Sequence, residues 1–278
     1  MKKRKIHLGH SPDPDDAFMF YALSANKIDT KGLEFVDTLM DIETLNRWAQ
    51  EGRLEVTAVS LHAFAYVSQT YALLTSGASI GRNYGPVLVS KKDLHLSNLR
   101  GRPIAIPGTL TTAFLVLSLC LRDFQPVVVP FDKVLDVVAK DRAAAGLVIH
   151  EGQLTYGKQG LKKVLDLGQW WHRETGLPLP LGVDVVRKDL GPEMMKLIGG
   201  LVRESIQYAF SHRDEALNHA LKYARGVDRA EADQFVAMYV NQDTLDMGEE
   251  GRRAVKLLLE RGYERGIIRQ PPALEFIN

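Results

Sequence analysis

The sequence predicts an α/β protein of two lobes, and three observations along its 278 residues support this. Over residues 5–74, short apolar segments typical of strands alternate with segments of helical spacing, which favours a mainly parallel sheet. A second alternation of the same kind follows in residues 85–157. From about residue 190 onward nearly every segment has helical spacing. We therefore expect two α/β lobes with long C-terminal helices packed on the first.

The first alternation predicts three strands and three helices. Pro12 and Pro14 keep the loop before the first helix extended, because a residue that precedes proline avoids the helical region. Phe18 and Tyr21 lie on one stripe of that helix. The expected strands are residues 5–11, 33–40 and 55–61, and the expected helices are residues 17–28, 41–54 and 62–74.

The second alternation begins at an apolar strand and contains a Pro-Gly turn before its first helix. Residues 177–191 (LPLPLGVDVVRKDLG) then return as an extended segment. The expected strands are residues 85–92, 103–106, 125–131 and 145–149, the helices between them are residues 109–121 and 134–144, and the later helices are residues 193–224, 229–241 and 249–266.

This order of elements predicts a discontinuous domain organisation. A large lobe would combine residues 1–92 with residues 184–278, and residues 93–183 would form a small inserted lobe. Two chain crossovers would join the lobes, near residues 85–90 and 181–186. A cleft between two lobes is a common place for a small-molecule site.

Composition excludes several classes of protein. A net charge of +1 gives no nucleic-acid footprint, and 45% hydrophobic with 25% charged residues is typical of a globular protein. The basic N-terminus is not followed by the apolar stretch of a signal peptide, and no apolar run reaches the roughly 18 residues needed to span a bilayer. We therefore expect a cytoplasmic protein without nucleic-acid or membrane partners. The single cysteine, Cys120, is expected to be a buried apolar residue.

The loop after the first strand concentrates negative charge, with Asp13, Asp15 and Asp16 next to two prolines. One interpretation is helix capping, in which Asp15 or Asp16 accepts hydrogen bonds from the first turn. One cap needs only one carboxylate, and loops at the carboxyl ends of parallel strands bind ligands in open α/β sheets. A second interpretation therefore turns one of these carboxylates toward the cleft. Metal binding is disfavoured, because no neighbouring residues have the spacing of metal ligands.

Three threonines, Thr109, Thr111 and Thr112, open the helix that follows the Pro-Gly turn. Free N–H groups at a helix start bind carboxylate or phosphate, and threonine hydroxyls add donors. The segment lacks the Gly-Lys-Ser/Thr of a Walker motif. An ordinary N-cap by one threonine is the alternative to an anion site.

His150 follows a buried apolar strand and is the strongest candidate for acid–base chemistry. A histidine at the carboxyl end of a strand titrates near neutral pH and can act as a general base. The alternative is a histidine that is only hydrogen-bonded at a strand end. Ser60 also ends a predicted strand, but no G-x-S-x-G elbow accompanies it, which disfavours a hydrolase. Trp170 and Trp171 are expected in the core rather than in a lid.

Several segments together resemble the menaquinone-biosynthesis enzymes of the futalosine pathway, and the resemblance covers nearly the whole chain. The I-H-E-x-x-x-T-Y element at residues 149–156 separates this chain from the chorismate dehydratases of the same family. The matching segments are SPDPDDAFMFYAL (11–23), VTAVSLHAFAYV (56–67), PGTLTTAFLVL (107–117), GLVIHEGQLTY (146–156), LPLPLG (177–182) and YVNQDTLDMGEEGRRAV (239–255).

The resemblance implies a two-lobe type II periplasmic-binding-protein-like fold used as a cytoplasmic enzyme. It implies a carbon-carbon lyase without a cofactor or a metal. The implied substrate, a small-molecule carboxylate, is cyclic dehypoxanthine futalosine. The implied products are 1,4-dihydroxy-6-naphthoate and a sugar-derived fragment.

The resemblance also assigns site residues. His150 would be the catalytic general base, Thr111 and Thr112 would contact the acidic group of the substrate, and Ser60 with the strand residues before it would contact the substrate from the first lobe. The full set of implied substrate-binding residues is Ser11, Asp16, Ala58, Val59, Ser60, Thr111 and Thr112.

The chain departs from the family pattern in the first lobe. Asp13 and Asp15 replace the Cys and Asn of S-P-C-P-N-D, Ala58 replaces a Lys, and Val183 and Asp184 interrupt LPLPLGG-N. These changes predict a more acidic cleft and leave open a divergent substrate. A cytoplasmic solute-binding or sensor protein of the same fold and a chorismate dehydratase-like enzyme remain as alternatives. Whether the chain forms a homodimer is left open.

Overall fold

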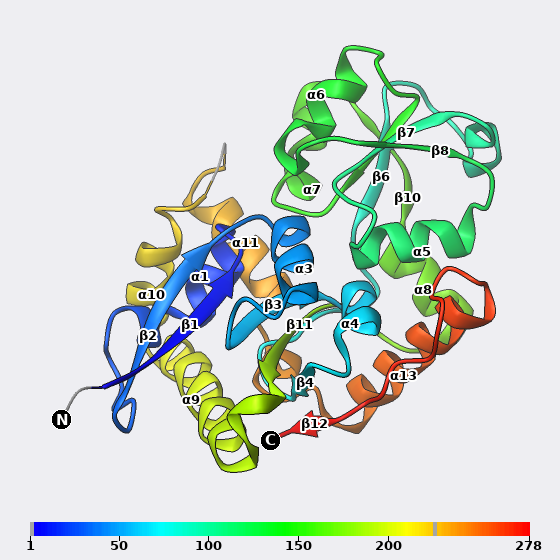
Figure 1. The fold of residues 1–278 in the computed structure, drawn as a ribbon. Coiled ribbons are helices and arrows are strands. Elements are labelled where there is room, and N and C mark those ends of the chain that lie inside the picture. Colours follow the sequence, from blue (N-terminus) through cyan, green and yellow to red (C-terminus); the bar gives the residue numbers. More distant parts are fainter. Residues whose placement is uncertain (1–2, 225–226) are drawn as a thin grey trace.

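The computed structural model describes residues 3–224 and 227–278, which form two lobes, each built on one β-sheet (Figure 1). In the large lobe the sheet has the strand order β12-β4-β11-β3-β1-β2, with β5 paired to β11. Its strands are β1 (Arg4–His10), β2 (Leu33–Leu39), β3 (Val56–Ser60), β4 (Tyr71–Leu74), β5 (Ser79–Gly81), β11 (Leu179–Arg187) and β12 (Phe276–Ile277).

The small lobe, drawn mainly in green and teal in Figure 1, has a sheet with the order β10-β6-β9-β7-β8. Its strands are β6 (Val87–Ser90), β7 (Pro103–Ile106), β8 (Gln125–Val128), β9 (Ala145–Val148) and β10 (Lys162–Asp166). The helices along this part of the chain are α5 (Thr112–Cys120), α6 (Val134–Ala139), α7 (Gly152–Thr155) and α8 (Leu167–Thr175).

Helices from both ends of the chain cover the large sheet. The N-terminal ones are α1 (Pro14–Met19), α2 (Tyr21–Ser24), α3 (Ile42–Gln50) and α4 (Leu61–Val67). The C-terminal ones are α9 (Pro192–Ser211), α10 (Arg213–Ala220), α11 (Arg229–Tyr239), α12 (Gln242–Leu245) and α13 (Gly248–Glu264). Within the described residues, every helix is too short or too polar to span a bilayer.

The apolar core is continuous from one lobe to the other. One cluster of buried residues joins Val59 and Val183 of the large sheet to Ile106 and Leu147 of the small sheet. Helix α5 belongs to the same cluster and contacts both α4 and α13. The small lobe is therefore packed against the large lobe and not merely tethered to it.

The strand pairings correct the predicted lobe boundaries. Strand β6 pairs with β9 and β10, so it belongs to the small sheet, whereas all of β11 pairs within the large sheet. The predicted boundaries at residues 92/93 and 183/184 were therefore too late at both junctions. A strand belongs to the sheet that satisfies its backbone hydrogen bonds. The chain therefore passes from the large lobe to the small lobe between β5 and β6, and it returns between α8 and β11.

The structure also corrects single elements. The predicted helix 62–74 ends at Val67, and Tyr71–Leu74 is strand β4, whose four residues are all buried. The first helix begins at Pro14, which suits the first position of a helix because proline lacks an N–H. Strand β10 was not predicted, because Lys162 and Lys163 are exposed on the edge strand and break the apolar signal.

Trp171 tests how much the shared core contributes to stability. Its ring is fully buried, its Nε1–H donates to the carbonyl of Pro178 at 3.0 Å, and Arg261 of α13 lies over the ring. We predict that Trp171→Ala lowers the free energy of unfolding by about 3–5 kcal/mol, as for other buried aromatic residues. Urea denaturation measures this. Trp170→Ala, at a partly buried neighbour, should have a clearly smaller effect, and equal losses would contradict the assignment.

Candidate functional site

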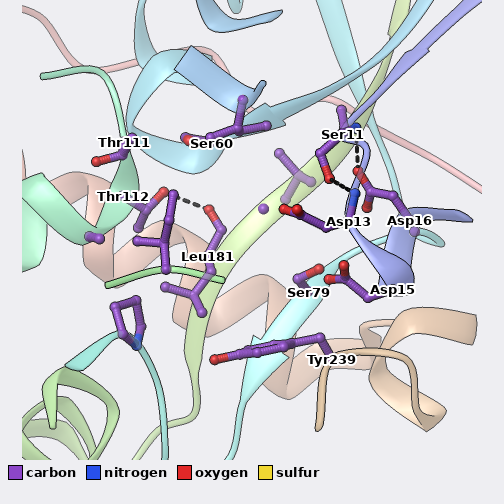
Figure 2. Close-up of a pocket in the computed structure, with 18 of the residues that line it drawn as sticks. Ser11, Asp13, Asp15, Asp16, Ser60, Ser79, Thr111, Thr112, Leu181 and Tyr239 are labelled. Carbon is purple, nitrogen blue, oxygen red and sulfur yellow. Dashed lines mark hydrogen bonds between the residues drawn. The ribbon is translucent and has the colours of Figure 1, made fainter. Parts of the chain in front are cut away.

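A cavity of about 730 Å³, partly open to solvent, lies where residues of the two lobes meet (Figure 2). Its lining combines carboxylates, hydroxyls, and apolar or glycine residues. The carboxylates are Asp13, Asp15, Asp16 and Asp184; the hydroxyls are Ser11, Ser60, Ser79, Thr111, Thr112 and Tyr239; and the others are Ile42, Ala58, Gly77, Pro86, Ala113, Ile149, Leu181, Gly182, Val183 and Phe235.

The acidic loop folds on itself beside the cavity. The Oδ2 atom of Asp16 accepts the N–H of Ser11 at 2.7 Å, and the Oγ atom of Ser11 accepts the N–H of Asp13 at 3.2 Å. The interpretation of Asp15 or Asp16 as the helix cap is wrong, since the N-cap residue is Asp13 and the Asp16 carboxylate turns back to the loop before α1. Asp15 Oδ1 is buried and has no hydrogen-bond partner among the described residues. The interpretation that turns part of this loop toward the cleft is the one that the structure favours.

The register between β3 and β11 builds the floor of the cavity. Gly182 lies opposite Ser60, and Asp184 lies opposite Ala58, so these residues share one face of the sheet. The side chain of Val59 points to the other face and is part of the core. Contact of Val59 with a substrate remains a prediction, and the cavity lining does not include this residue.

Ser60 is held in place by Asn46 of α3. The N–H of Ser60 donates to Asn46 Oδ1 at 2.8 Å, and Asn46 Nδ2 donates to Ser60 Oγ at 3.1 Å. Both side chains are buried. This pair of hydrogen bonds fixes the orientation of the Ser60 hydroxyl at the edge of the cavity.

Asp184 is the most unusual group in the cavity. Its side chain is 0% exposed, and neither carboxyl oxygen has a hydrogen-bond partner in the described part of the chain. Burial and the charge of Asp16 raise its pKa well above the ordinary value. Burial also raises the pKa of Asp15, and the neighbouring carboxylates Asp16 and Asp13 add to this effect. The acidic side of the cavity therefore favours protonated carboxyl groups.

The opposite side of the cavity is the beginning of α5. Thr111 is the N-cap, and its Oγ1 accepts the N–H of Phe114 at 3.2 Å and donates to the carbonyl of Gly108 at 3.0 Å. An ordinary N-cap by one threonine, the predicted alternative to an anion site, is thus confirmed for Thr111. Thr112 and Ala113 also line the cavity, and the first N–H groups of a helix have no partner within it. This end of the cavity suits an anionic group.

Four hydrogen bonds, two of them buried, connect the lobes around the cavity. The N–H of His62 donates to Thr112 Oγ1 at 3.2 Å, and Thr112 Oγ1 donates to the carbonyl of Leu181 at 2.5 Å. On the other side, Tyr239 Oη donates to Gln153 Oε1 at 2.9 Å. The N–H of Leu110 also donates to Glu43 of α3, at 3.2 Å. These contacts fix the relative position of the two walls.

His150 lies beside the cavity, but its ring does not line it. The side chain is buried, with the residue 8% exposed, and the ring of Phe131 packs edge-on against it at 5.4 Å. The N–H of Gly152 donates to His150 Nδ1 at 2.9 Å, so in the neutral ring Nε2 carries the proton and donates to the carbonyl of Phe131 at 3.1 Å. Its neighbour Ile149 does reach the cavity.

The structure thus brings together six of the seven residues predicted to bind substrate, and it leaves Val59 and the ring of His150 outside the lining. Sequence reasoning missed Gly77, Ser79, Phe235 and Tyr239, because each belongs to a loop, strand or helix that meets the cavity only through the tertiary fold. For Asp184 there was a signal. It is the one charged residue in GVDVV, an otherwise apolar strand segment.

Comparisons with solved structures define the fold class. Protein AF1704 from Archaeoglobus fulgidus is 47% identical, with a TM-score of 0.92, over 95% of this chain and 98% of that one. The alkanesulfonate-binding protein SsuA from Xanthomonas axonopodis pv. citri, bound to MOPS, shares only 10% identity but has a TM-score of 0.74 over 98% and 96% of the two chains. The predicted periplasmic-binding-protein-like fold is therefore confirmed.

Sequence comparisons then give the family. The family model described as menaquinone biosynthesis matches residues 6–264. The chain is 42% identical to a 1,4-dihydroxy-6-naphtoate synthase of Thermus thermophilus over 98% of its length and 99% of the relative, and 35% identical to a protein of the same name from Streptomyces coelicolor over 99% and 100%. The chain belongs to this menaquinone-biosynthesis family, and the resemblance found in the sequence is confirmed.

The buried carboxyl of Asp184 gives a prediction for stability against pH. A raised pKa means that the folded state holds the proton more tightly, so its stabilisation is complete below the unfolded pKa and is lost as pH rises toward the folded pKa. Asp184→Asn cannot ionise. Relative to wild type, this variant should gain about 1.4 kcal/mol of unfolding free energy per pH unit from about pH 4 until the folded pKa is reached.

Urea denaturation between pH 4 and pH 8 measures this difference. Buried His62, whose pKa is lowered by burial to about 4, lowers stability as pH falls from about 6.5 to 4, but it does so in both proteins and cancels. Asp93→Asn, in an exposed loop, controls for the change in net charge. A difference between Asp184→Asn and wild type that does not change with pH would contradict the prediction.

Proposed function

We propose that the protein is a lyase of menaquinone biosynthesis that cleaves cyclic dehypoxanthine futalosine to 1,4-dihydroxy-6-naphthoate and a sugar-derived fragment. The observation that carries the proposal is the interlobe cavity, which gathers Ser11, Asp16, Ala58, Ser60, Thr111 and Thr112 from separate segments. The near-full-length relatives named 1,4-dihydroxy-6-naphtoate synthase support the same reaction. Their biosynthetic role also supports the predicted location in the cytoplasm.

In this proposal the two walls of the cavity have different tasks. The carboxylate of the substrate binds the N–H groups at the start of α5, near Thr112 and Ala113, where the helix dipole favours negative charge. The Ser60 hydroxyl, oriented by Asn46, contacts the substrate from the large lobe. The lobe contacts around the cavity limit access of water and hold the substrate in one orientation, which contributes to the rate through positioning.

His150 is the proposed general base. Its lone pair is on Nδ1, which accepts the N–H of Gly152, so the ring must turn away from Gly152 and past Ile149 before it can take a proton from the substrate. Glu151 Oε2 lies 3.8 Å from Nδ1 and would stabilise the imidazolium that then forms. This movement is the step of the mechanism that the proposal adds to the observed geometry.

The base assignment predicts a separation of turnover from binding. His150→Ala should lower kcat by about 10²–10⁴-fold, the usual contribution of one general base, while the dissociation constant changes little. Mass spectrometry of the naphthoate product and calorimetric titration measure the two quantities. Because His150 also bonds to Gly152 and Phe131, circular dichroism and urea denaturation of the variant must accompany both.

One result would contradict the base assignment. Turnover of a folded His150→Ala variant at the wild-type rate would show that another group takes the proton. His172→Ala, in helix α8 and outside the cavity lining, is the matched control and should keep wild-type turnover.

A binding or sensor protein is the second candidate function. The observation that favours it is the position of the His150 ring, which is bonded to main-chain groups and lies outside the cavity lining. This function predicts that the pure protein binds the cyclic futalosine and releases no product. The turnover assay of the wild-type protein therefore distinguishes the two functions.

A further inference from the structure

We propose that the carboxyl groups of Asp184 and Asp15 form a subsite that binds the hydroxyl groups of the sugar-like part of the substrate. The inference rests on the proposed function for the identity of that substrate. The inference adds to that function the orientation of the substrate between the two walls of the cavity. It also names the residues of this chain that recognise the sugar-like part.

The first step of the argument is the unsatisfied state of Asp184. The side chain is fully buried, lines the cavity and leaves both oxygens without a hydrogen-bond partner in residues 3–224 and 227–278. Buried polar groups in native proteins nearly always have partners. A carboxyl group that lines the cavity without a hydrogen-bond partner is therefore suited to bind a ligand that supplies this partner.

The second step is the local structure that holds the carboxyl group there. Strand alternation sends Val183 and Val185 into the core and Asp184 to the face shared with Ala58. Gly77 leaves space for it, because a Cβ atom at residue 77 would lie 1.9 Å from Asp184 Oδ2. The position is thus fixed by the backbone on both sides.

The third step concerns the acidic loop, whose Asp16 carboxylate lies close enough to Asp184 for its charge to act on it. Asp15 Oδ1 is also buried and has no partner in the described structure. Figure 2 shows Asp15, Ser79 and the Ser11 loop on the side of the cavity away from Thr111 and Thr112. One end of the cavity therefore offers carboxyl and hydroxyl groups, and the other offers the N–H groups of α5.

The chemistry of this wall favours hydroxyl groups over charged ligands. Among the described residues that line the cavity none is Lys or Arg, so an anion would meet carboxyl and hydroxyl groups but no positive charge at this end. No three His, Cys, Asp or Glu side chains in the described chain are placed to hold a metal ion. Burial favours neutral carboxyl groups, which both donate and accept hydrogen bonds, as hydroxyl groups do.

The test compares two replacements of Asp184 by calorimetric titration with cyclic dehypoxanthine futalosine. Asp184→Leu removes every hydrogen bond and should weaken binding by about tenfold to a hundredfold, the loss of one or two buried hydrogen bonds. Asp184→Asn keeps a donor and an acceptor, so its dissociation constant should stay within about threefold to fivefold of the wild-type value, a much smaller loss of affinity than in Asp184→Leu. Asp15→Leu should weaken binding as well. Asp189→Asn, on an exposed turn after β11, is the control.

The product 1,4-dihydroxy-6-naphthoate is the second probe, because it lacks the sugar-derived part. Its affinity should be the same in wild type and in all Asp184 variants. Equal losses for both probes would overturn the proposal, since they would indicate only a structural role. A loss in Asp184→Asn as large as in Asp184→Leu would also overturn it, since that pattern indicates recognition of a cation by an ionised carboxylate.

The failure of the proposed function gives a different result. If the wild-type protein binds no cyclic futalosine, the proposed substrate is wrong, and the subsite is tested with D-ribose at millimolar concentration. Binding of D-ribose to wild type and Asp184→Asn, but not to Asp184→Leu, would support the subsite. No binding of D-ribose to the wild-type protein would overturn it.

Discussion

The antiparallel pairing of β11 with β3 is the constraint on which the site depends. It returns the chain from the small lobe to the centre of the large sheet, so that residues from both halves of the sequence share one cavity floor. The same register sends Val183 and Val185 into the shared core and places Asp184 opposite Ala58. Packing of the two valines in the core therefore holds the Asp184 carboxyl group in the cavity, away from bulk water.

The cavity is consequently asymmetric. Helix α5 offers N–H groups at one wall, and the loop that begins at Ser11 offers carboxyl groups at the other. The bonds from His62 and Tyr239 to the small lobe hold these walls at a fixed separation. A ligand that is acidic at one end and hydroxylated at the other fits this arrangement in one orientation only, and reaction chemistry requires such a fixed orientation.

Much of the fold could be predicted from the sequence, because strand and helix periods are local signals. The helix expected over residues 62–74 failed because Tyr71–Leu74 is apolar at every position, and a fully buried strand cannot be told from a buried helix by period alone. Six of the predicted substrate-binding residues meet in the cavity, because most of them lie at a strand end or a helix start and Ala58 lies in β3 on the same face as Ser60. The direction of the His150 ring depends on Phe131 and Gly152, which no pattern around residue 150 reveals.

A crystal structure of the protein with bound cyclic dehypoxanthine futalosine tests the central claim most directly. The account predicts the carboxylate of the ligand at the start of α5 and its sugar-derived hydroxyl groups within hydrogen-bond distance of Asp184 and Asp15. A ligand bound in the reverse orientation, or outside this cavity, would contradict it.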